Sequence, residues 1–214
     1  MSFFEALYRA GDAVYGEAPD AFMVANLPLR GGTALDAGGG QGRHALWLAR
    51  NGYRVDLVDA SPAAVERCAA IAVEHGLPVE AQVADLRDWT PRRAYDLIVC
   101  AVTLHAFKSH RATAVAERLR SALAPGGTLY LSAHLAPSDE QRRREIAEQP
   151  QVEPRTYLAD GHIKRLFSVD EMRGLLAWPA VAEEIVSDER CPRADCPYLH
   201  ELYRGIANKP AEAR

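Results

Sequence analysis

The sequence has few cysteines and no long apolar run. Four of its 214 residues are cysteine, too few for the disulfide framework of a small secreted domain. No segment approaches the roughly 20 apolar residues of a membrane-spanning helix, and Met1 to Glu5 lack the charged start and apolar core of an export signal. We therefore expect a cytoplasmic protein without a membrane partner, whose Cys68 and Cys100 are reduced and buried.

An excess of basic charge is also absent. The 25 Lys and Arg residues are outnumbered by 29 Asp and Glu residues, which leaves a net charge of −4. Binding to nucleic acid depends largely on neutralising phosphates with basic side chains, so we expect a small-molecule ligand and no nucleic acid. The hydrophobic content of 48% is typical of a folded chain. Its length predicts one domain over residues 1–214, as a monomer or homodimer.

Strand and helix patterns alternate through the first two thirds of the chain. Apolar runs predict strands at 33–36, 54–59, 78–84, 95–102 and 128–133, and amphipathic patterns predict helices at 43–51, 62–75 and 109–123. This alternation predicts an α/β fold with a doubly wound, mostly parallel sheet. After a capping-box helix at 168–177, two further strands at 181–187 and 199–207 predict an antiparallel hairpin that completes a seven-stranded sheet.

Two segments lie outside this alternation. Residues 1–30 precede the first predicted strand and are expected to form an N-terminal lid. Residues 135–167 are expected to form an insertion on the substrate side. Arginines 142–144 within this insertion are interrupted by acidic residues, which favours a solvated helix over an RNA-binding patch.

A glycine-rich loop joins the first predicted strand to the first predicted helix. Asp36 to Gly42 reads Asp-Ala-Gly-Gly-Gly-Gln-Gly. In an open α/β sheet, ligands bind at the carboxyl ends of the strands, and glycines let the backbone approach a ligand closely. Gly40 to Ala45 fits the dinucleotide pattern G-x-G-x-x-G/A, with Asp59 at a suitable distance. An NAD(P)-binding oxidoreductase is therefore one interpretation, although no Tyr-x3-Lys pair accompanies it.

Asp36 favours a different cofactor. A carboxylate beside the loop would repel a pyrophosphate, whereas a cofactor with a cationic amino-acid end could donate a charge-assisted hydrogen bond to it. The register from Leu35 through Asp59 resembles the first two motifs of the class I S-adenosylmethionine-dependent methyltransferases. The resemblance implies a Rossmann-like fold, S-adenosyl-L-methionine as cofactor, and methyl transfer by in-line displacement with release of S-adenosyl-L-homocysteine.

The resemblance also implies the cofactor-binding residues. Asp59 is expected to accept hydrogen bonds from the ribose hydroxyls, and Asp85 is expected to meet the adenine amino group. Ala60 and Leu86 would cover the adenine ring. The complete expected set is Tyr15, Asp36, Gly38, Gly40, Gly42, Asp59, Ala60, Asp85, Leu86 and Ala101.

The residues after the fourth predicted strand bear on the methyl acceptor. Val102 to His105 lack the Asn/Asp-Pro-Pro-aromatic motif of enzymes that methylate bases or glutamine, which favours a small molecule. Residues 15–22, 42–49, 52–55 and 59–62 resemble the small tellurite-resistance and thiopurine-type methyltransferases. That narrower resemblance implies that Tyr15 and Phe22 cover the cofactor, and that the acceptor is a thiol or chalcogen compound.

Candidate acceptor-side residues are Arg43, Phe22, His105 and Arg204. A hydroxyl acceptor would require a general base, for which His105 is the candidate catalytic residue, whereas a thiol or chalcogen would need little base. The chain departs from the tellurite group at 191–201, which has no histidine-rich segment. Cys191, Cys196 and His200 offer no standard zinc spacing, so we expect no metal. A non-catalytic adenosyl-ligand-binding module on the same fold is the remaining alternative.

Overall fold

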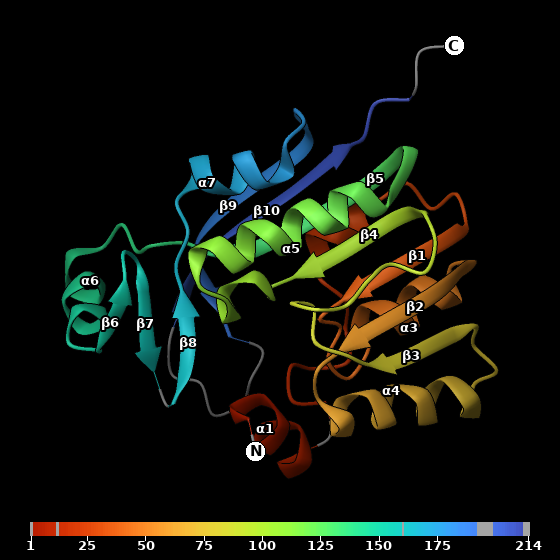
Figure 1. Ribbon diagram of the computed structural model, residues 1–214, viewed down its shortest axis with the longest axis horizontal. Helices are drawn as coiled ribbons and strands as arrows, with labels where there is room; N and C mark the ends of the chain where they lie inside the picture. The colour runs from red at the N-terminus through yellow and green to blue at the C-terminus, as the bar shows by residue number, and fades with distance from the viewer. Residues whose placement is uncertain (1, 12, 160, 192–198, 212–214) are drawn as a thin grey trace.

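A seven-stranded sheet forms the centre of the protein (Figure 1). The computed structural model describes residues 2–11, 13–159, 161–191 and 199–211. The strand order is β3-β2-β1-β4-β5-β10-β9, in which β10 is antiparallel to both of its neighbours. The strands are β1 (Gly32–Ala37), β2 (Tyr53–Asp59), β3 (Val79–Val83), β4 (Tyr95–Ala101), β5 (Leu123–His134), β9 (Ala180–Arg190) and β10 (Leu199–Asn208). The predicted mostly parallel sheet with an antiparallel C-terminal strand is confirmed.

Helices cover both faces of this sheet. On one face α2 (Ala21–Asn26), α3 (Arg43–Arg50) and α4 (Pro62–Glu74) contribute apolar side chains to the core. On the other face α5 (Ser109–Ala122) and α7 (Val169–Leu176) pack against β4 and β5. The α4 helix begins at Pro62 because Ser61 caps it by accepting a hydrogen bond from the Ala64 amide. Burial on both faces explains the continuous apolar run of β4.

The segment between β5 and α7 forms a small sheet of its own. After α6 (Glu140–Ala147) come β6 (Gln151–Glu153), β7 (Thr156–Ala159) and β8 (His162–Arg165), which pair in the order β6-β7-β8. The α6 helix agrees with the predicted solvated helix and buries none of its residues. The three short strands were not predicted.

The N-terminal helix α1 (Phe3–Ala10) lies near α4 and the carboxyl ends of the parallel strands (Figure 1). No helix among the described residues is long and apolar enough to cross a membrane. Cys68 and Cys100 are buried free thiols, as predicted, whereas Cys196 lies outside the described residues.

Candidate functional site

The glycine loop between β1 and α3 is closely enclosed. Gly38, Gly40 and Gly42 all have positive φ angles, of 71°, 54° and 87°, a region that side chains disfavour. A Cβ on Gly40 would lie 2.6 Å from the Tyr8 hydroxyl oxygen, and one on Gly38 would collide with Thr103. Glycine is therefore required here for both backbone conformation and space, as in a loop that a ligand approaches closely.

Asp59 joins the end of β2 to this loop. Its Oδ2 accepts a hydrogen bond from the Gly40 amide at 2.9 Å, and its Oδ1 accepts one from the Ser61 amide at 2.9 Å. Burial raises the pKa of Asp59, against the effect of these amide hydrogen bonds. The carboxylate is half-buried, and each oxygen retains a further lone pair. The loop and the acid thus form one site, and hydrogen bonding of Asp59 to a cofactor ribose stays a prediction.

Asp36 lies beneath the loop rather than in it. The side chain is buried and its Oδ2 accepts a hydrogen bond from the Ala45 amide at 3.0 Å, which holds the first turn of α3 against β1. Burial raises the pKa of Asp36 to about 7. A Cβ on Gly39 would lie 2.7 Å from this carboxylate. Asp36 therefore supports the loop from below.

The N-terminal segment covers the same loop. Gln41 ties it down, because its Oε1 accepts from the Val14 amide and its Nε2 donates to the Gly11 carbonyl, both at 2.9 Å. Arg43 donates to the Tyr15 carbonyl at 3.3 Å. Tyr15 also contacts the ring of Tyr8 at 6.1 Å between centroids. These contacts place the N-terminal segment against the glycine loop, and its role as a lid stays a prediction. Gln41 and Tyr8 were missed because no local pattern marks long-range contacts.

Other predicted cofactor residues lie at the same edge with different surroundings. Asp85 is half-buried and forms an ion pair with Arg87 at 2.5 Å. Leu86 is buried in the core on the α5 side, and Ala60 is exposed. The Ala101 carbonyl accepts a hydrogen bond from the Thr103 hydroxyl. Their contacts with a cofactor stay predictions.

Two predicted acceptor-side residues are engaged elsewhere. Phe22 packs against the core formed by α2, α3 and α4. Arg204 is buried, and its guanidinium forms ion pairs with Asp20, Glu184 and Glu189 at 2.8, 2.8 and 2.9 Å. Substrate binding by either residue stays a prediction, and these contacts give each a structural role.

Histidines lie close together after the carboxyl ends of β4 and β5. A short 3₁₀ helix η1 (Leu104–Ala106) follows β4, and Thr103 before it donates to the Gly38 carbonyl at 3.2 Å. This places His105 beside the glycine loop. The ring of His105 stacks on that of His134, which ends β5, with 5.1 Å between centroids. Burial, followed by the nearby charges of Lys164 and His162, lowers the pKa of His105 to about 3.

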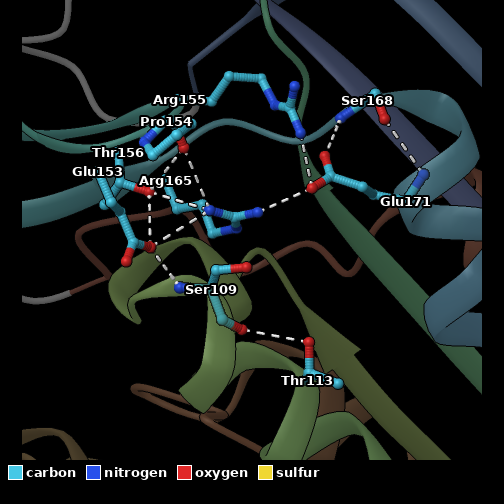
Figure 2. Close-up of polar contacts among 9 residues, drawn as sticks. All are labelled: Ser109, Thr113, Glu153, Pro154, Arg155, Thr156, Arg165, Ser168 and Glu171. Atoms are coloured by element: carbon cyan, nitrogen blue, oxygen red, sulfur yellow. Dashed lines mark hydrogen bonds and ion pairs between the residues drawn. The ribbon is translucent and has the colours of Figure 1, made fainter.

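Arg165 fixes the position of β8 (Figure 2). This buried side chain reaches Glu171 at the start of α7 at 2.8 Å, and Thr156 on β7 at 3.0 Å. It also lies 3.4 Å from Glu153, whose Oε1 accepts from the Ser109 amide at the start of α5. The small sheet is thereby attached to both helices on one face of the main sheet.

Residues 34–127, which contain the glycine loop, Asp59 and His105, match the family model described as a methyltransferase domain. The matched segment is less than half of the chain and is similar to methyltransferase domains. This similarity supports the expected cofactor, S-adenosyl-L-methionine. The chain also has the fold of a solved structure described as an S-adenosylmethionine-dependent methyltransferase from Methanosarcina mazei. That structure has a TM-score of 0.76 and 19% identity, and the match covers 91% of this chain and 100% of the other.

Curated relatives match this chain over part of their length. Hemagglutinin 1 from Eikenella corrodens is 35% identical over 100 residues, which cover 46% of this chain and 33% of the relative. Ubiquinone biosynthesis O-methyltransferase from Xanthomonas euvesicatoria is 29% identical over 113 residues, which cover 52% and 46%. The chain therefore spans less than half the length of the curated relatives that it matches.

Proposed function

We propose that this protein transfers a methyl group from S-adenosyl-L-methionine to a small-molecule acceptor. The observation that carries the proposal is the hydrogen bond from the Gly40 amide to Asp59, because it unites the glycine loop and the acid after β2 in one site. The methyltransferase domain match over residues 34–127 supports it independently.

The chain's own residues have distinct roles in this proposal. The cofactor, when bound, supplies a methyl group already activated by its sulfonium. The loop backbone at Gly38 to Gly42 lies against it, Asp59 accepts hydrogen bonds from its ribose, and Asp36 positions the loop through the Ala45 amide. Alignment of donor and acceptor of this kind contributes about 7–11 kcal/mol to lowering a barrier.

The acceptor atom decides whether a base is needed. His105 is neutral at pH 7 because burial lowers its pKa, so it is in the form that can take a proton from an acceptor. We propose His105 as the general base for a hydroxyl acceptor. A thiol or chalcogen acceptor, as the tellurite-resistance and thiopurine-type resemblance implies, ionises more readily and would leave His105 with a binding role.

Titration calorimetry with the three candidate ligands tests the proposal. S-adenosylmethionine and S-adenosylhomocysteine are expected to bind and NADH is not. Asp59→Asn is expected to weaken both adenosyl ligands about tenfold or more, since a hydrogen bond to a charged group contributes about 1.5–3 kcal/mol. Asp96→Asn is the matched control, because Asp96 bonds Thr33 at the opposite edge of the sheet.

Three outcomes separate the alternatives. Binding of NADH without either adenosyl ligand would establish the oxidoreductase interpretation. Binding of the adenosyl ligands without methyl transfer to any of a panel of thiols, phenols, carboxylates and chalcogen oxyanions would favour the non-catalytic module. Equal affinities for Asp59→Asn and the unmodified protein would remove Asp59 from the site.

A further inference from the structure

The carboxyl edge of the sheet carries a group of imidazole rings beside the glycine loop. His134, at the end of β5, lies between His105 on η1 and His200 on β10. Its ring centroid is 5.1 Å from that of His105 and 4.4 Å from that of His200. The contact of Thr103 with Gly38 connects η1 directly to the cofactor loop. Three elements that are distant in sequence thus bring their histidines together where an acceptor must reach the cofactor.

The small sheet β6-β7-β8 adds two more residues to this group of histidines. On β8, His162 and Lys164 are two residues apart and therefore share one face of the strand. The charge of Lys164 acts on both His105 and His134. We name His105, His134, His162, His200 and Lys164 the histidine cluster.

Two phenylalanines from α1 border the histidine cluster. Phe3 stacks on the ring of His162 with 4.0 Å between centroids, and Phe4 meets the edge of the His105 ring at 6.1 Å. The N-terminal helix therefore gives the cluster an apolar wall. A ligand with a flat apolar body and a polar group fits such surroundings.

Buried nitrogens in the cluster have unused hydrogen-bonding capacity. The Nδ1 atoms of His105 and His134 are buried and have no hydrogen-bond partner among the described residues. Leaving a buried polar atom unpaired costs about 1–3 kcal/mol, so a site that binds a polar ligand explains them better than a structural core does. No group of three or more His, Cys, Asp or Glu residues in the described ranges is placed to hold a metal ion.

The electrostatics of the cluster favour negative charge. Burial lowers the pKa of His134 well below its usual value, and the neighbouring His105, His200 and Lys164 lower it further. The same burial and the charges of Lys164 and His162 keep His105 neutral. An anion placed among these groups would be attracted by Lys164 and would favour protonation of an adjacent imidazole.

We propose that the histidine cluster is the acceptor-binding site and takes a small organic anion together with one proton. The proton comes from the solvent and adds to an imidazole nitrogen, which leaves an imidazolium beside the anionic group and breaks no bond of the ligand. The inference rests on the proposed function, because it names the acceptor class of that site.

Calorimetry with benzoate and its neutral counterpart benzamide tests the proposal. Both are titrated into the full chain, with and without S-adenosylhomocysteine, at about pH 6 and about pH 8. Linkage to one proton is expected to make benzoate affinity roughly tenfold or more higher at the lower pH. Titrations in two buffers of different ionisation enthalpy are expected to show uptake approaching one proton. Benzamide is expected to bind more weakly, with no pH dependence.

Matched variants locate the effect. His134→Gln and Lys164→Met are each expected to weaken benzoate about tenfold or more and to leave S-adenosylhomocysteine affinity unchanged. His75→Gln, in the exposed residue that ends α4, is the control and is expected to change neither. Two variants are used so that a folding defect in one, seen by circular dichroism, leaves the other as the test.

The outcomes distinguish this inference from the proposed function. The inference is wrong if benzoate does not bind, if benzamide binds equally well, if benzoate affinity is the same at both pH values, or if His75→Gln weakens benzoate as much as His134→Gln does. Failure of S-adenosylhomocysteine to bind would instead overturn the proposed function, and the benzoate titration without it would still test the cluster.

Discussion

Asp36 shows how one buried acid can support a loop from below. Its carboxylate is 1% exposed and accepts a hydrogen bond from the Ala45 amide, and direct contact of Asp36 with a cofactor stays a prediction. Burial raises the pKa of this acid to about 7. Ionising Asp36 in the folded protein costs free energy, so its contribution to the free energy of unfolding depends on pH and can be measured.

Asp36→Asn is expected to change the pH dependence of stability. The folded protein binds the Asp36 proton more tightly than the unfolded chain, so the stability that this proton contributes is present below about pH 4 and lost as the pH rises to about 7. The free energy of unfolding of the wild type, relative to Asp36→Asn, is expected to fall by a few kcal/mol over this range. Urea unfolding of both proteins at a series of pH values measures it.

The free energy of unfolding of the wild type must be compared with that of Asp36→Asn at each pH, because other groups titrate in the opposite sense. His105 and His134 have lowered pKa values, so they reduce stability as the pH falls below about 6.5 in both proteins. Asp96→Asn, at an exposed acid, is the matched control. A difference between wild type and Asp36→Asn that stays constant with pH would show that Asp36 is not the titrating group.

Residues that follow a local register could be predicted from the sequence, and residues that meet across the fold could not. Asp36 and Asp59 were found because their distances from the glycine loop are fixed by one strand-loop-helix unit. His105 was found because it follows β4. The contact between the His134 and His200 rings depends on the antiparallel pairing of β5 with β10, for which the sequence offers no local signal.

At the scale of elements, β8 brings His162 and Lys164 to the site, and Arg165 on its opposite face holds it. Figure 2 shows the Arg165 guanidinium between Glu153 and Glu171, which belong to the small sheet and to α7. The Glu171 carboxylate also accepts from the Ser168 amide in the capping box of α7. The strand therefore has a defined position relative to the main sheet, and this position sets the histidine cluster.

Arg165→Met is expected to displace β8 and weaken acceptor binding. Loss of the buried guanidinium leaves Glu153 and Glu171 without this partner and is expected to lower the free energy of unfolding by about 3 kcal/mol. Benzoate affinity is expected to fall severalfold and S-adenosylhomocysteine affinity to remain. Urea unfolding and calorimetry measure the three quantities.

Arg144→Met is the matched control for this change. Arg144 pairs with Glu140 on the exposed surface of α6, and an exposed pair contributes about 0–1 kcal/mol. We expect neither stability nor benzoate affinity to change appreciably. Normal benzoate binding by a folded but destabilised Arg165→Met protein would show that β8 does not position the cluster.

Long elements with strong periodicity were predicted well and short ones were not. The helices α3, α4, α5 and α7 begin and end close to the predicted residues. The strands β6, β7 and β8 have only three or four residues each, too few to establish an alternating pattern. A strand was predicted at 128–133, whereas β5 begins earlier, at Leu123, and passes through Gly126 at a φ of 76°.

At the scale of the whole molecule, contacts between the two ends of the chain build the side of the sheet next to α2. Arg204 on β10 joins Asp20, which caps α2, to Glu184 and Glu189 on β9. Gln41 bonds the backbone of Gly11 and of Val14 and so holds both beside the glycine loop. The N-terminal segment is thus attached both to the glycine loop and to the last strands of the sheet.

Arg204→Met separates the structural role of this residue from the predicted substrate role. Its side chain and that of Asp20 are 8% and 10% exposed, so the variant leaves a nearly buried carboxylate without its cation. We expect the free energy of unfolding to fall by about 3 kcal/mol, with unchanged benzoate affinity in the folded protein. Urea unfolding and calorimetry measure both.

A double-mutant cycle with Asp20→Asn completes this test. If the cost of Arg204→Met comes from the orphaned carboxylate, the double variant is expected to be more stable than Arg204→Met alone, with a coupling energy of about 1–3 kcal/mol. Arg173→Met, which removes an exposed partner of Glu183, provides the control and is expected to cost less than about 1 kcal/mol. A variant Arg204→Met that keeps its stability but loses benzoate binding would instead place Arg204 in the acceptor site, because its three ion pairs would then contribute little to holding the chain ends together.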